Sequence, residues 1–400
     1  MKYFLSAALL FVLLCTQVNA QQIEAPRFGK GILNFVQKDS TWSLKFAARM
    51  QLLGSGTWSG NDGDYNDFES NFLVRRARLK FDGFAFSDKF EYKFELGLSN
   101  RDISGGSIYT GNTPRYILDA VVKWNFYKNF VLWFGQTKLP GNVERVISSG
   151  DLQLVDRSLL NARFNIDRDV GAQLRHSHTF GPKFLVREIF AFSQGEGRNV
   201  VVGNIGGYQY TSRVELLPFG AFTDDNEYEG SALEREETPK LMLASTYDIN
   251  ANAVRTRSNM GTYMENDIGL YQTTISTLFV DLVFKYKGFS FMGEYADRNA
   301  DDPIAKNSDG TTTGQVVQVG NGLNLQGGYL FKNNWEVAAR YSNIDLDRAI
   351  TSKPTENQYT LGVSKYLVGH KLKVQTDISY LSVIESSNQL MARLQVDVHF

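Results

Sequence analysis

Apolar and polar residues alternate along much of this chain, and the alternation is clearest near its C-terminal end. From Leu390 to Phe400 every second residue is apolar, and polar residues such as Arg393, Gln395 and Asp397 stand between them. Successive side chains of a β-strand point to opposite faces, so this stretch has one apolar face and one mostly polar face. A tilted strand of about ten residues crosses a bilayer. The pattern therefore predicts a membrane-spanning strand.

The same alternation recurs in about sixteen segments, and an even strand number is typical of bacterial barrels. The segments begin near residues 41, 68, 89, 115, 129, 168, 183, 208, 239, 275, 288, 320, 334, 356, 370 and 389. We expect an all-β fold, a transmembrane antiparallel β-barrel of about sixteen strands that occupies residues 41–400. Such a barrel leaves an aqueous lumen lined by the polar faces of its strands.

The connections between these segments alternate in length. Short ones lie near residues 87–88, 127–129, 180–182, 287–288, 332–334 and 369–370, and long ones span about 59–67, 100–114, 139–166, 194–207, 250–274, 299–318 and 343–355. Short periplasmic turns and long outer loops are typical of single-chain barrels. The acidic connection 219–238 breaks this rhythm, because its position is periplasmic and its length is not.

Composition supports a barrel embedded in a lipid bilayer. After residue 20 no apolar run approaches the ~18 residues that a membrane helix needs. Aromatic residues nevertheless make up 13% of the 400 residues, with 28 Phe and 19 Tyr. Several of them flank the short connections, among them Phe86, Phe126, Tyr127 and Phe331. Aromatic girdles lie at the membrane interfaces of barrels, so we expect one at the short-turn end.

The first forty residues are expected to lie outside the barrel. Residues 1–20 have a positive residue, Lys2, an apolar core and the small-residue site Val18-Asn19-Ala20, which together predict a cleavable signal peptide. Residues 21–40 would form a short periplasmic lead-in. Cys15 is the only cysteine, so the mature chain would have no disulfide and no thiol chemistry. We therefore expect export to the periplasm and insertion into the bacterial outer membrane.

Any ion selectivity must come from where the charged residues lie, because basic and acidic residues are nearly equal in number. The chain has 42 basic and 43 acidic residues and a formal net charge of -1, so no nucleic-acid partner is indicated. Arg76, Arg78 and Lys80 share one strand face and predict a strip of positive potential along the lumen. The alternation places Leu73, Ala77, Leu79 and Phe81 on the opposite face, and it places Leu118, in a later segment, on the outward face. It also turns Arg49, Lys93 and Lys123 inward. The alternative is a wall of cross-strand ion pairs with no net selectivity.

The connection 139–166 is the second candidate for chemistry. It has apolar residues of its own, which indicates that it packs against the barrel, and an outer loop folded into the lumen narrows a pore. Arginine binds phosphate through two parallel hydrogen bonds. The candidate residues at the narrowing are Lys138, Arg145, Asp156, Arg157, Arg163 and Arg168. Carboxylates stand beside these arginines, so each arginine could equally pin the loop to the wall.

Four short motifs resemble the phosphate-selective porin O/P family. They are Arg75-Arg76-Ala77-Arg78-Leu79-Lys80-Phe81, Gly135-Gln136-Thr137-Lys138-Leu139-Pro140, Val155-Asp156-Arg157-Ser158 and Arg168-Asp169-Val170-Gly171. The resemblance spans the mature chain. It implies a sixteen-stranded homotrimeric porin with an inward-folded constriction loop and a basic ladder for small anionic solutes such as phosphate. No cofactor is implied. A general, non-specific porin is the alternative.

Other functional classes have less support. An enzyme on a barrel wall would need a convergent His, Ser and acid set, and the four histidines have no partnered serine. His176 and His178 could share a strand face, but two residues do not complete a metal site. The acidic stretch Asn61–Asp67 lacks the full spacing of a calcium loop. A plugged importer would need a globular plug ahead of the barrel, and a soluble sandwich would have shorter strands.

Overall fold

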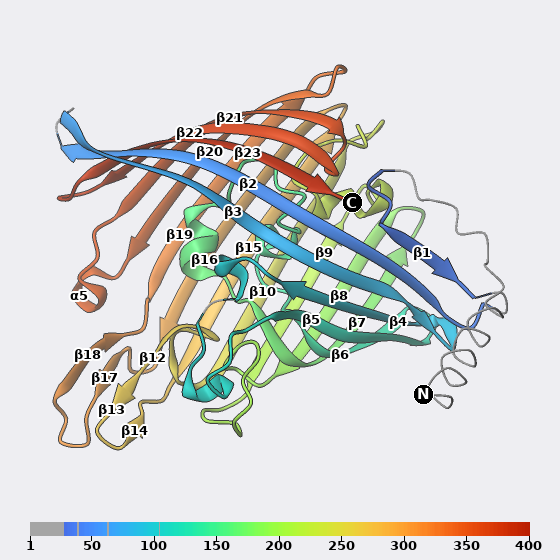
Figure 1. Cartoon of the computed structure of the whole chain (residues 1–400). Helices are drawn as coiled ribbons and strands as arrows, with labels where there is room; N and C mark the ends of the chain where they lie inside the picture. The colour runs from blue at the N-terminus through green and yellow to red at the C-terminus, as the bar shows by residue number, and fades with distance from the viewer. Residues whose placement is uncertain (1–27, 38–39, 62–63, 104) are drawn as a thin grey trace, which may run out of the picture.

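The computed structural model describes residues 28–37, 40–61, 64–103 and 105–400. The predicted signal peptide, Cys15 and Asp62 lie outside these residues. The described chain forms one seventeen-stranded antiparallel sheet, and all of its strands except β1 form a closed barrel (Figure 1). The sixteen barrel strands are β2 (Ser43–Asn61), β3 (Asp64–Ala85), β4 (Ser87–Gly97), β5 (Ile117–Tyr127), β6 (Phe130–Lys138), β7 (Arg168–Phe180), β8 (Phe184–Ser193), β9 (Gln209–Leu217), β10 (Lys240–Ala253), β15 (Thr273–Tyr286), β16 (Phe289–Ala300), β19 (Gly320–Leu330), β20 (Trp335–Leu346), β21 (Glu356–Val368), β22 (Leu372–Val383) and β23 (Asn388–His399).

The barrel closes between its first and last strands. β23 pairs antiparallel with β2 from Arg49↔His399 to Gly60↔Asn388. β1 (Leu33–Val36) pairs with the first residues of β2. It lies on the same edge of β2 as β23, which pairs with the rest of that strand. Phe400 donates its backbone N–H to the carbonyl of Ala48 at 2.8 Å. The predicted barrel of about sixteen strands is confirmed, and β1 lies within the segment expected to lead into it.

The first hairpin is longer than the alternation indicates. β2 has 19 residues and β3 has 22, and they remain paired as far as Asn61 and Asp64. The expected long connection at 59–67 is therefore wrong. The rings of Trp58 and Phe68 lie 4.9 Å apart across the hairpin, and such cross-strand aromatic pairs stabilise strand pairing.

The outer surface of the barrel is apolar. Exposed aromatic residues near the short-turn end include Phe86, Phe126, Tyr127, Phe180, Phe289, Phe331 and Trp335. Their position agrees with the expected girdle. In the described part of the chain, no helix has both the length and the apolar character needed to cross a membrane.

A β-bulge changes the face of the basic strip. Gln51 pairs with Arg76 and Leu52 pairs with Val74, so Arg75 is an extra residue on β3. A bulge lets two consecutive side chains point to the same side. Arg75 and Arg76 both point into the lumen, where they bond Asp156 and Gln51.

This bulge and a second irregularity each correct one assignment made from strict alternation. Before the bulge in β3, Phe72 and Val74 face outward. Leu73 therefore faces inward, as does its partner Leu53. A second irregularity lies between the pairs Glu95↔Asp119 and Leu96↔Ile117. It leaves Leu118 buried against the lumen rather than on the lipid face.

The connection after β6 crosses the lumen. It contains the short helices α3 (Val143–Val146) and α4 (Leu159–Phe164), and α4 packs against β16, β19 and β20. Leu160 and Phe164 are fully buried in a core with inward residues of the wall, such as Phe279 and Ile344. The inward-folded loop is therefore present, and it fills one side of the barrel.

The acidic connection after β9 also folds into the barrel, from the opposite end. Residues 218–239 contain the short 3-10 segment η3 (Thr223–Tyr228). Phe222 and Tyr228 pack against Val143 and Ile147 of the loop that follows β6. The two segments meet inside the lumen, which explains why this periplasmic connection is long.

The remaining elements lie in the outer loops. They are α2 (Asn100–Ile103), η2 (Ile108–Thr110), β11 (Arg255–Arg257), β12 (Met260–Tyr263), β13 (Glu265–Asn266), β14 (Gly269–Leu270), β17 (Ile304–Lys306), β18 (Thr312–Val316) and α5 (Arg348–Thr351). The β11–β14 and β17–β18 hairpins project beyond the barrel at the end opposite to β1 and the C-terminus (Figure 1).

Candidate functional site

Three cavities follow one another along the lumen beside β2–β7. The central cavity is about 200 Å³ in volume, the outer cavity about 620 Å³ and the inner cavity about 220 Å³. The outer and central cavities share Arg101, Asp167, Arg168 and Arg198 in their linings. The central and inner cavities share Arg78, Lys93, Glu95 and Ser148. The three therefore form a continuous row, called here the conduit.

The central cavity has a large excess of positive charge. Its basic lining residues are Arg75, Arg76, Arg78, Lys93, Arg101, Lys138, Arg145, Arg157, Arg168 and Arg198, and its acidic ones are Glu95, Asp102 and Asp167. The cations exceed the carboxylates by seven. A narrow cavity with low-dielectric walls concentrates such a potential and attracts anions.

Several of these cations are held by carboxylates. Arg78 contacts Glu95 at 2.9 Å and Asp102 at 2.7 Å. Lys93 and Arg168 share Asp119, at 2.7 and 3.0 Å. Arg145 pairs with Asp167 in the same way. These pairs fix the positions of the side chains, and they cancel part of the charge.

Lys138 and Arg157 are held differently. Lys138 Nζ donates to the carbonyls of Val146 at 2.9 Å and Ile147 at 3.1 Å. Arg157 donates from Nε to the Glu144 carbonyl at 2.9 Å and from Nη2 to the Ile147 carbonyl at 2.7 Å. Among the described residues no carboxylate forms an ion pair with either side chain. Carbonyl oxygens orient an ammonium or guanidinium group without forming an ion pair, so neither end group is paired with a carboxylate.

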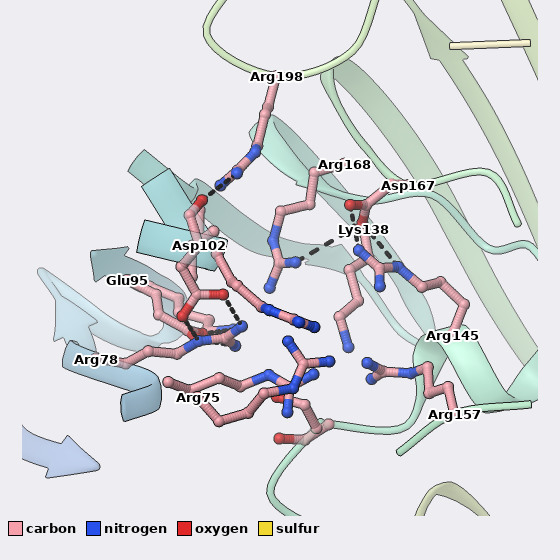
Figure 2. Close-up of a pocket in the computed structure, with 16 residues that line it drawn as sticks. Arg75, Arg78, Glu95, Asp102, Lys138, Arg145, Arg157, Asp167, Arg168 and Arg198 are labelled. Carbon is pink, nitrogen blue, oxygen red and sulfur yellow. Dashed lines mark hydrogen bonds and ion pairs between the residues drawn. The ribbon is translucent and has the colours of Figure 1, made fainter. Parts of the chain in front are cut away.

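Figure 2 shows the end groups of Lys138 and Arg157 close together in the central cavity, with Arg168 to one side of them. Burial, together with the neighbouring Arg145 cation, lowers the pKa of Arg157 to about 9. Arg157 therefore still carries its charge at neutral pH. This closeness of like charges is unfavourable without a counter-ion, and a bound anion would relieve it.

The single acidic candidate, Asp156, ties the loop to the basic strip. It accepts from Arg75, and Arg76 Nη2 lies 3.7 Å from it. Burial alone would raise the pKa of Asp156, but Arg75, Arg76 and Arg393 hold it well below its usual range. The carboxylate therefore stays ionised. Arg76 itself donates to Gln51 Oε1 at 2.7 Å.

The structure brings seven of the sequence-predicted cations into the central cavity, namely Arg76, Arg78, Lys93, Lys138, Arg145, Arg157 and Arg168. The other four lie elsewhere. Arg49 pairs with Asp397 at 3.1 Å and Lys80 with Asp82 at 3.0 Å, and both line the inner cavity. Lys123 contacts Glu91 at 3.2 Å close to the short-turn end, and Arg163 pairs with Glu356 at 2.7 Å beside the outer cavity.

Sequence reasoning missed several arginines. Arg75 was hidden by the bulge. Arg198, Arg255 and Arg257 come from outer loops and donate to the backbone carbonyls of Asp102, Glu196 and Ala162, respectively. The spacing Arg255-Thr256-Arg257 was a visible signal, since two residues at that spacing share a strand face. All but Arg75 line the outer cavity.

The sequence matches the family model of phosphate-selective porins O and P over residues 55–397. The chain belongs to this family. Members are outer-membrane porins, so the barrel forms a channel through the outer membrane. A comparison with curated protein sequences gave no match.

Solved porins share the fold of this family member at low sequence identity. The anion-selective porin of Comamonas acidovorans is 11% identical, with 90% of this chain and 100% of that chain covered and a TM-score of 0.51. OmpF of Salmonella typhi, in complex with daunomycin, is 10% identical, covers 92% and 100% of the two chains and has a TM-score of 0.54. The trimer form of in-vitro folded OmpT of Vibrio cholerae is 13% identical, covers 89% and 99% and has a TM-score of 0.50.

Proposed function

We propose that this porin conducts small anions passively along the conduit, and that phosphate-like oxyanions bind transiently between Lys138 and Arg157. The observation that carries the proposal is the way these two cations are held. Each is anchored by neutral backbone carbonyls. Their charges are therefore both fixed in position and uncompensated.

The arrangement of the remaining cations supports a path rather than an isolated site. The outer cavity presents arginines to the external solution, and it shares Arg168 and Arg198 with the central cavity. Beyond the central cavity, Arg49 and Lys80 line the inner cavity. A wall with several basic residues lets an anion move from one residue to the next. Conduction requires that no single position binds the anion too tightly for release, and several weak positions meet that requirement. The movement follows the concentration gradient and uses no cofactor.

The family and a related fold also support a homotrimer. Residues Gly54, Gly56, Phe68 and Phe72 line an apolar hollow on the outer face of the first hairpin. OmpT of Vibrio cholerae, which shares the fold, is described in a trimer form. Native mass measurement of the detergent-solubilised protein tests this assignment, and a monomeric mass would contradict it.

The test of anion conduction is single-channel recording of the refolded protein under a potassium chloride gradient. We expect an anion-sided reversal potential and a chloride current that added phosphate reduces. A reversal potential near zero without a phosphate effect would favour a general porin. A cation-sided potential would contradict the proposal outright.

A further inference from the structure

The connection 218–239 has contacts that fix it inside the barrel. Gly230 donates its backbone N–H to the Asp151 carbonyl at 2.7 Å, which joins this connection to the loop after β6. Tyr228 donates its hydroxyl to Glu215 Oε2 of β9 at 2.6 Å. The connection is thus bonded both to the wall and to the other inward segment.

The wall behind the connection is not built to face water. Met242, Val283 and Met292 point inward from β10, β15 and β16, and they are buried against Phe222 and Leu152 of the two inward segments. Inward residues of a water-filled channel are polar. An apolar inner surface of this kind needs a cover, so this half of the lumen is a packed core.

Charged groups of the same wall are also covered. Lys285 Nζ donates to the carbonyls of Asn226 at 2.5 Å, Glu229 at 2.9 Å and Ser231 at 2.6 Å. Glu336 accepts from Ser231 Oγ at 3.0 Å. Both Lys285 and Glu336 are only 1% exposed. Polar groups of residues 218–239 therefore take the place of water around these charges.

The covered wall differs from the conduit in its charge. β15, β16 and β20 each carry one acidic and one basic buried residue on their inward faces, namely Asp281, Lys285, Glu294, Arg298, Glu336 and Arg340. The charges on these three strands balance, whereas the central cavity has a strong excess of cations. Ions that moved along the covered wall would meet no net preference for either sign.

We propose that residues 218–239 are a selectivity-determining plug, which together with the loop after β6 seals the charge-balanced half of the lumen and confines ions to the basic conduit. The proposal rests on the proposed function, because it takes the conduit to be the anion path. A second, unselective path in parallel would bring the anion and cation permeabilities of the whole channel closer together. Anion preference then depends on a segment that need not touch the permeating ion.

Cysteine accessibility tests the seal without disturbing the fold. The only natural cysteine, Cys15, lies in the predicted signal peptide. Ser231 is fully buried in the plug, and Ser148 is exposed where the central and inner cavities meet. In Ser148→Cys, a charged methanethiosulfonate reagent is expected to modify the thiol and change the current. In Ser231→Cys, we expect modification at least about a hundredfold slower. Comparable rates in the two variants would overturn the plug.

Shortening the connection tests its effect on selectivity. Replacement of residues 219–238 by a short glycine–serine turn should raise conductance about twofold and lower the anion-to-cation permeability ratio at least about threefold. The matched control is Glu234→Gln with Glu237→Gln, which removes exposed acidic charge and keeps the plug. Unchanged conductance in the shortened, folded protein would overturn the proposal, and so would a selectivity shift reproduced by the control. If the shortened protein does not fold, the cysteine pair decides.

Failure of the plug and failure of the proposed function give different results. A wild-type channel without anion preference would contradict the proposed function, while slow modification of Ser231→Cys would still show a sealed half. An anion-preferring wild type with rapid modification of Ser231→Cys would contradict the plug alone.

Discussion

Arg75 donates from Nη2 to both carboxylate oxygens of Asp156, at 2.8 and 2.9 Å, and so joins strand β3 to the loop that crosses the lumen. The contact depends on the bulge that turns Arg75 inward. Arg76 also approaches Asp156, and the two arginines together hold the loop on the side opposite its apolar core. The loop is therefore anchored at both sides of the conduit.

Arg75→Met should loosen this side of the loop. Arg75 and Asp156 are mostly buried, and Asp156 would keep its weaker contacts with Arg76 and Arg393. We therefore expect the free energy of unfolding to fall by about 1–3 kcal/mol. Thermal unfolding measured by gel mobility, together with the open-channel current noise, tests the prediction. Lys80→Met is the control, because its pair with Asp82 is more exposed and worth less than about 1 kcal/mol. Equal stability of the two variants would contradict the anchoring role.

Removal of the two carbonyl-held cations should weaken phosphate binding. In Lys138→Met with Arg157→Met, we expect the concentration of phosphate that halves the chloride current to rise about tenfold or more, since charge-assisted hydrogen bonds contribute about 1.5–3 kcal/mol each. Lys123→Met is a control at the short-turn end, where Lys123 is already paired with Glu91. If the control and the double variant respond alike, the site lies elsewhere.

Neutralisation of Arg78 should affect selectivity more than neutralisation of Lys80. Loss of Arg78 removes the ion pair to Asp102 in the central cavity and leaves Glu95 paired with Lys93 alone. Loss of Lys80 leaves only the more exposed Asp82. We expect the reversal potential of Arg78→Gln to move toward the cation side, and that of Lys80→Gln to change little. Equal shifts would favour a potential set by the whole lumen rather than by the central cavity.

The outer loop 194–208 should become less stable as pH rises. Glu196 is almost fully buried and accepts from the backbone N–H groups of Ile205 and Gly206, and burial raises its pKa to about 7. An unfolded glutamate has a pKa of about 4.3. Between these values the folded loop binds more protons than the unfolded loop, so its stability falls as pH increases from about 4 to about 7.

Hydrogen exchange of residues 194–208, corrected for the intrinsic rate, measures this effect. Exchange should be faster at pH 8 than at pH 5 in the wild type, and the difference should be smaller in Glu196→Gln, whose amide imitates the neutral acid, while Asp169, which accepts from the Gly195 N–H, still titrates. Glu265→Gln, which changes an exposed glutamate, should behave as the wild type. A wild-type loop with the same corrected exchange at both pH values would contradict the prediction.

The sequence by itself determined the barrel. Alternation with a period of two depends only on neighbouring residues, and it predicted the strands, their number and the short-turn end correctly. It failed at Leu73 and Leu118, and it did not place Arg75 in the lumen, because two register irregularities reverse the alternation and no local signal in the residues marked them. It also failed at the first hairpin, where polar residues continue the pairing that aromatic contacts support.

Only the tertiary structure decided how each charge is held. Lys138, Arg157 and Arg168 are all cationic residues in the sequence, but Asp119 pairs with Arg168, while carbonyl groups hold the other two. Such partners come from residues far apart in the chain, and their geometry depends on how the loop packs. The same holds for residues 218–239. Their length was visible in the sequence, but their place inside the lumen follows from apolar wall residues, such as Met242 and Val283, that meet them only in the closed barrel.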